Sequence, residues 1–116
     1  MARAATTSDV FNAIAEPQRR QILDLLAKGE QPVNGIVEAL QMKQPQVSKH
    51  LGVLKEVGLV TVRSEGRQRL YRLNGDALQP VYTWLTPYEQ FWKESHDRLD
   101  VLLQKAQSEK ANDKSE

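Results

Sequence analysis

The sequence predicts a mainly α-helical fold with one small β-hairpin. The chain has 116 residues, an ordinary length for one domain, and its 40% hydrophobic content is sufficient for a globular core. Apolar residues recur at helical spacing in most segments, whereas residues 59–73 alternate as strands do. Helices therefore dominate, and one pair of strands interrupts them.

Two helices are expected near the N-terminus, over residues 9–15 and 17–27. Pro17 separates them, because the residue before a proline is biased away from the helical region. Gly29 ends the second helix, and residues 29–32 are predicted to be a connector.

Two further helices follow. Asn34 is a good N-cap for a short helix that ends near Leu40, and Pro45 suits the first turn of a longer helix that Gly58 closes. The longer helix should pack against Ile36 and Leu40 through one apolar face, formed by Val47, Leu51 and Leu54.

The alternating segment after Gly58 predicts two strands joined by a turn at residues 64–67, with the second strand at 68–73. The complete order is helix, helix, short helix, turn, longer helix and hairpin, followed by a C-terminal helical region. This order is that of a winged helix-turn-helix.

The chain resembles the ArsR/SmtB family of bacterial transcriptional regulators over residues 8–75. The most specific part is QPQVSKHLGVLKEVGLV, followed by a wing with Arg63, Gly66, Arg67 and Tyr71 in the pattern R-x-x-G-R-x-x-x-Y. The resemblance implies a homodimeric repressor that binds an inverted repeat in double-stranded DNA. The chain has no cysteine, which excludes disulfides and thiolate metal sites and places it with the cysteine-free members.

The helix after Pro45 carries polar side chains where a recognition helix would meet base edges. Glutamine can bind adenine through two hydrogen bonds, and lysine suits a phosphate. The candidate DNA-binding residues of this helix are Gln44, Gln46, Ser48, Lys49 and His50.

The wing supplies positive charge. Residues 1–75 contain 11 basic and 7 acidic side chains, a net charge of +4, whereas residues 76–116 carry −3. We expect Arg67 and Arg69 to contact DNA, and Arg63 and Arg72 either to contact DNA or to form structural ion pairs. Tyr71 is expected to be a half-buried strand residue. The same charge could instead be a solvated surface that the acidic tail balances.

The C-terminal apolar stripe either completes the core of its own chain or pairs with a second copy. We favour pairing, because the stripe has more aromatic side chains than a small domain needs. In the family the terminal helices form the dimer interface, which implies a homodimer that pairs through Val10, Phe11, Ile14, Trp84, Tyr88, Phe91, Trp92, Leu99 and Leu102.

These features divide the chain into three parts. Residues 1–75 are predicted to be a DNA-binding domain that includes an N-terminal dimerisation helix, residues 76–107 to be dimerisation helices, and residues 108–116 to be a disordered tail. The N-terminus lacks the apolar core of a secretory signal, and no stretch approaches 18 apolar residues, so we expect a cytoplasmic protein without a membrane segment.

Other function classes have less support. The sequence contains neither a G-x-S-x-G motif nor a glycine-rich phosphate loop, so these signs of an enzyme are absent. Glu94 and His96 resemble half of a family metal site, but Gln107 and Lys110 stand where its second half would be, so no metal or cofactor is expected. The alternative is a winged helix that binds proteins or responds to a small molecule. No particular effector follows from the sequence.

Overall fold

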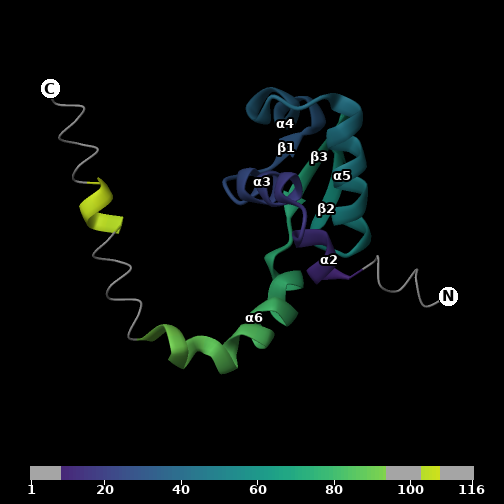
Figure 1. Ribbon diagram of the computed structural model, residues 1–116. Helices are drawn as coiled ribbons and strands as arrows, with labels where there is room; N and C mark the ends of the chain where they lie inside the picture. Colours follow the sequence, from purple (N-terminus) through teal and green to yellow (C-terminus); the bar gives the residue numbers. More distant parts are fainter. Residues whose placement is uncertain (1–8, 94–102, 108–116) are drawn as a thin grey trace, which may run out of the picture. The chain divides into compact units, whose positions relative to one another are not determined.

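The structure, a computed structural model, describes residues 9–93 and 103–107 (Figure 1). The chain divides into two compact units, residues 1–82 and 83–116. The division falls later than the boundary predicted after residue 75, because Ala77 and Leu78 still pack against the core of the first unit.

The first two helices lie where the sequence predicts them. Helix α2 (Val10–Ile14) begins after Asp9, whose carboxylate accepts a hydrogen bond from the backbone N–H of Asn12 at 2.7 Å. Helix α3 (Pro17–Leu26) has its proline in the first turn, where the missing N–H costs nothing. The predicted break at Pro17 is confirmed.

The segment between α3 and α5 differs from the prediction in two ways. Residues Gln31–Pro32 are a short strand, β1, rather than a connector, and helix α4 (Val33–Leu40) follows at once. Pro32 is the N-cap residue of α4, so the predicted N-cap role of Asn34 is wrong. Asn34 lies exposed in the first turn.

Helix α5 (Gln44–Glu56) starts and ends as expected. Pro45 lies in its first turn, and Gly58 follows it with a φ of 84°, a conformation that glycine adopts without strain. The turn before α5 contains Gln41, whose φ of 56° and ψ of 44° are left-handed. A non-glycine residue therefore occupies a conformation that favours glycine.

The sheet has three antiparallel strands in the order β1-β3-β2. Strands β2 (Val60–Glu65) and β3 (Gln68–Leu73) form the predicted hairpin. Its two-residue loop starts at Gly66, whose φ of 63° fits a type II′ turn. Strand β1 adds a third strand at the β3 edge, where Pro32 is tolerated because an edge strand needs fewer N–H donors.

The core of the first unit lies where α3, α4 and α5 meet the sheet (Figure 1). Helices α4 and α5 pack together as predicted, with Ile36 buried in the core and Leu40 partly buried against it. The largest fully buried side chains come from all these elements: Ile22, Ile36, Val47, Leu51, Leu54, Leu59 and Val60.

The C-terminal region is helical in the part that the structure describes. It comprises the 3₁₀ turn η1 (Gly75–Leu78), helix α6 (Gln79–Leu85), a second 3₁₀ turn η2 (Thr86–Tyr88) and helical residues 89–93 and 103–107. Pro87 lies in η2, between α6 and the helical residues that follow. Within the described ranges, no helix is long and apolar enough to cross a membrane.

Candidate nucleic-acid interface

The N-terminal half of α5 presents a polar surface to solvent. Gln44, Ser48 and Lys49 are all exposed, as the sequence predicts. Gln44 and Ser48 are four residues apart and so lie on one face of the helix. No acidic side chain occurs in the first turn of the helix. This surface offers an amide, a hydroxyl and an ammonium group.

His50 does not belong to that surface. Only 8% of the residue is exposed, so the prediction that it faces outward is wrong. Position 50 lies three residues after Val47 and four before Leu54, which places it on the apolar face that packs against the rest of the domain. This spacing is visible in the sequence and could have identified His50 as buried.

A small polar cluster holds His50 and half-buried Gln46 against α3. The side-chain oxygen Oε1 of Gln18 accepts a hydrogen bond from Nε2 of Gln46 at 2.6 Å and lies 3.0 Å from Nε2 of His50. The Nη1 atom of Arg19 lies 3.5 Å from Nδ1 of His50. Gln18 and Arg19 were not predicted as site residues, because nothing in their own helix indicates a contact with residues so distant in sequence.

Arg19 also joins α2 to this cluster. Its guanidinium donates hydrogen bonds to the backbone carbonyls of Ala13, at 2.7 Å, and of Asn12, at 3.3 Å. The carbonyls at the end of a helix lack partners within the helix. Arg19 provides a donor for the carbonyl of Ala13 and a second donor for that of Asn12, which also accepts from the backbone N–H of Ala15 at 3.2 Å. One side chain therefore contacts both α2 and a residue of α5.

The surroundings of His50 disfavour a charged ring. Burial lowers the pKa of His50 below the ordinary value for histidine, the charges of Arg19 and Lys49 lower it further, and Glu16 opposes the shift. The imidazole is consequently more strongly biased to the neutral form than an exposed histidine.

The wing, defined here as β2, β3 and their loop, carries exposed arginines. Arg67 in the loop and Arg69 in β3 are both exposed, as expected for side chains that would meet a phosphate backbone. Tyr71 is half-buried against the core, which confirms its predicted packing role.

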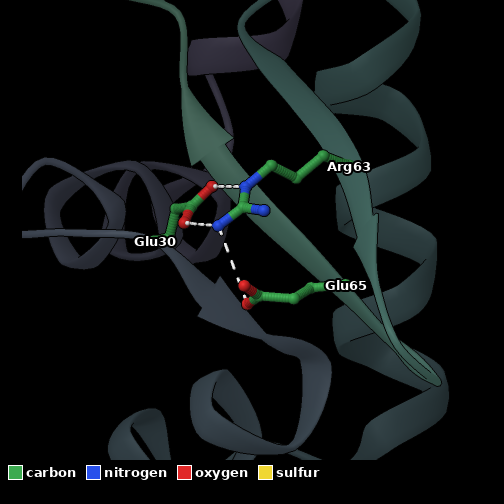
Figure 2. Close-up of polar contacts among 3 residues, drawn as sticks. All are labelled: Glu30, Arg63 and Glu65. Carbon is green, nitrogen blue, oxygen red and sulfur yellow. Dashed lines mark hydrogen bonds and ion pairs between the residues drawn. The ribbon is translucent and has the colours of Figure 1, made fainter.

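Within the part of the chain that the structure describes, Arg63, unlike Arg67 and Arg69, forms an ion pair, with Glu30. Its Nε and Nη2 atoms donate to the two carboxylate oxygens of Glu30 at 2.8 and 2.9 Å, and Glu65 lies 3.7 Å from Nη2 (Figure 2). Hydrogen bonding to Arg63 lowers the pKa of Glu30, and the same contact raises the pKa of Arg63. This ion pair is one of the two roles expected of Arg63, and it links the wing to the segment that precedes β1.

Aromatic side chains are exposed in both compact units. In the first unit Phe11 is 43% exposed, whereas Val10 and Ile14 pack partly against the core. In the second unit the predicted interface residues Leu99 and Leu102 lie outside the described residues. The exposed aromatic residues there are Trp84, Tyr88, Phe91 and Trp92.

Three aromatic rings of the second unit, those of Trp84, Tyr88 and Phe91, form a continuous row. The ring centroids of Trp84 and Tyr88 are 5.6 Å apart, and those of Tyr88 and Phe91 are 6.4 Å apart. Phe91 nevertheless stays 68% exposed. Such contiguous aromatic surface usually marks a contact with another molecule.

Comparison with known proteins identifies the family. The model for bacterial regulatory proteins of the arsR family matches residues 16–62. The transcriptional repressor SdpR of Bacillus subtilis is 36% identical over 78 residues, which are 67% of this chain and 87% of SdpR. The protein belongs to the ArsR family.

Two solved structures of ArsR-type proteins share the fold. The homodimeric winged helix-turn-helix DNA-binding domain of Mb0332 from Mycobacterium bovis is 35% identical with a TM-score of 0.60, and the match covers 77% of this chain and 82% of that one. An ArsR-like regulator from Rhodococcus sp. RHA1 is 28% identical with a TM-score of 0.63, and the match covers 91% of this chain and 97% of that one.

Family membership settles the function class. ArsR-family proteins are transcriptional regulators, and the relatives that match are repressors and regulators rather than enzymes, so the predicted exclusion of catalysis is confirmed. Between residues 9 and 93 and over 103–107, no three histidine, aspartate or glutamate side chains gather as metal ligands would. Glu94 and His96, the residues that resemble half of a family metal site, are outside these ranges.

Proposed function

We propose that this ArsR-family regulator is a homodimeric repressor that binds an inverted-repeat operator through α5 and the wing. The observation that carries the proposal is the polar, exposed N-terminal half of α5 in the same compact unit as a wing with exposed arginines. A recognition helix needs outward donors and acceptors at its N-terminal end, and the wing needs cations for the phosphates.

Each exposed side chain receives a role under this proposal. Gln44 and Ser48 contact base edges or the adjacent sugar-phosphate backbone, and Lys49 contacts a phosphate. Arg67 and Arg69 contact phosphates or a narrow minor groove. Gln46 remains a candidate for base contact, while buried His50 positions its neighbours rather than touching DNA.

Dimerisation follows from the same argument. Two recognition helices about one helical turn apart on DNA read two half-sites of a palindrome. The exposed aromatic row of the second unit and Phe11 of the first supply apolar area for pairing. The bound dimer would block access to a promoter, and the whole process would take place in the cytoplasm.

The proposal is tested by DNA binding. Anisotropy titrations at one stated salt concentration compare duplexes from the intergenic region upstream of the gene with a scrambled duplex of equal composition. We expect the operator to bind at least about a thousandfold more tightly. Gln44→Ala and Ser48→Ala should each reduce this ratio, whereas Gln21→Ala, which changes an exposed glutamine on α3, should not. Equal affinity for all duplexes would refute the proposal.

A further inference from the structure

The cluster between α3 and α5 fixes more than the position of a buried histidine. Its members are Arg19 and Gln18 on α3 and His50 and Gln46 on α5. Gln46 is the member nearest the N-terminus of the recognition helix. The hydrogen atoms of the cluster can be assigned one by one, starting from Arg19.

Arg19 determines which nitrogen of His50 carries the proton. A guanidinium group can donate hydrogen bonds but has no lone pair that accepts one. The Nδ1 atom of His50, which lies 3.5 Å from Arg19, must therefore offer its lone pair. In the neutral ring the proton is then on Nε2.

That proton determines the orientation of Gln18. The Nε2–H group of His50 requires an acceptor, and the amide oxygen of Gln18 lies 3.0 Å away. A flipped Gln18 amide would place its NH₂ group against this N–H, donor against donor. The oxygen of Gln18 therefore faces α5.

The same oxygen then determines the orientation of Gln46. Only the NH₂ group of Gln46 can donate to it, at 2.6 Å, so Nε2 of Gln46 points toward Gln18 and the carbonyl oxygen points the other way. In the described part of the chain, neither this oxygen nor the second N–H of Gln46 has a hydrogen-bond partner. One acceptor and one donor remain for DNA.

We propose that Gln18 is a positioning residue for sequence readout, which holds the Gln46 amide in the one orientation that pairs with adenine. Adenine presents N6–H₂ as a donor and N7 as an acceptor in the major groove, which matches the remaining oxygen and N–H of Gln46. Gln18 acts through Gln46 and need not touch the base. This inference rests on the proposed DNA-binding function.

The experiment is selection of binding sites from a pool of random duplexes, followed by titration of the selected duplex and of single-base variants. The wild-type protein should select adenine at one position per half-site, preferred over other bases by about tenfold. Gln46→Ala identifies that position, because the preference there should disappear. Gln18→Met, which keeps the side chain's length and removes the acceptor, should reduce the same preference to about twofold or less.

Two matched variants separate positioning from folding. Gln18→Glu keeps an acceptor for Gln46 and His50 and should retain the adenine preference, although its charge weakens overall affinity. Gln21→Met makes the same substitution at an exposed position of α3 and should leave the preference unchanged.

A second measurement needs no substitution at Gln18. Nitrogen-15 NMR of the histidine rings distinguishes the two tautomers, and His96→Gln assigns the signals. We expect His50 to carry its proton on Nε2, and an Nδ1–H ring would overturn the inference.

The failures are distinguishable. If the wild-type protein selects no sequence, the DNA-binding proposal is wrong. The protein could instead select a site in which Gln46→Ala changes nothing, or in which Gln18→Met keeps the full adenine preference. Either result would support the DNA-binding proposal and refute the positioning role of Gln18.

Discussion

His50 is the one buried polar residue that the structure describes between residues 9 and 82, and its protonation state is coupled to the stability of the fold. The unfolded chain binds a proton at His50 near pH 6.5, whereas burial and Arg19 lower the pKa of the folded state below this value. Well above pH 6.5 the ring is neutral in both states. As the pH falls below 6.5 the unfolded state takes up the proton first, so the free energy of unfolding decreases until the folded-state pKa is passed.

Replacing His50 with a neutral amide should remove this part of the pH dependence. We expect the free energy of unfolding of His50→Gln to fall less than that of the wild type between about pH 7.5 and pH 5, as measured by urea unfolding. His96→Gln removes the other histidine and serves as the control. Parallel pH profiles for the wild type and His50→Gln would contradict the assignment.

For single residues, the sequence predicted which side chains of α5 are exposed better than it predicted which side chains of other helices they contact. Gln44, Ser48 and Lys49 are exposed because they fall opposite Val47, Leu51 and Leu54 on a regular helix. The contacts of Gln18 could not be predicted in the same way, since they depend on how α3 crosses α5. Helical spacing determines the face on which a residue lies but not its neighbour on another helix.

In the proposed complex, the exposed arginines of the wing contribute positive charge that attracts the phosphate backbone of DNA. Each cation that neutralises a phosphate releases condensed counterions, so its loss reduces the slope of log affinity against log salt by about 1. We expect this change for Arg67→Ala and for Arg69→Ala, with similar loss of affinity for operator and scrambled DNA.

The matched control is Lys55→Ala, which removes an exposed charge from the last turn of α5, away from its N-terminal end. It should leave the slope unchanged. An unaltered slope in both arginine variants would show that the wing does not contact phosphates.

The turn before α5 is strained at Gln41. Its left-handed backbone costs about 1 kcal/mol for a residue with a Cβ atom, and its side chain recovers part of this by donating to the carbonyl of Glu38 at 2.9 Å. Gln41→Gly should therefore be more stable than Gln41→Ala by about 1 kcal/mol, because both lose the side-chain hydrogen bond and only alanine keeps the strain. Urea unfolding measures the difference. Equal stability would mean that the turn relaxes in one of the variants.

Element order was predictable where the periodic pattern was long enough. The break at Pro17, helix α5 and the hairpin all follow from several residues of consistent spacing. Strand β1 was missed because two residues cannot show an alternation, and its existence depends on pairing with β3. The N-cap of α4 was misassigned because β1 was missed. Pro32 is the last residue of β1, and its extended backbone makes it the N-cap of α4.

On the scale of the whole molecule, the order of elements sufficed to predict a winged helix-turn-helix, but a single chain leaves a surface that it does not cover. The four aromatic residues of the second unit expose on the order of 400 Å² of apolar area, roughly half of what one partner contributes to a stable interface. Phe11 and further apolar residues must supply the rest in the proposed dimer.

The double variant Trp84→Ser/Phe91→Ser should weaken self-association at least about tenfold, because two exposed aromatic anchors lose their apolar area. Sedimentation velocity over a range of protein concentrations measures this, and Phe91→Tyr, which keeps the ring, should remain dimeric. The double variant should also lose the affinity that the wild type gains from two half-sites over one, while its affinity for an isolated half-site stays the same. A double variant that remains dimeric and binds the full operator as the wild type does would place the dimer contact elsewhere in the chain.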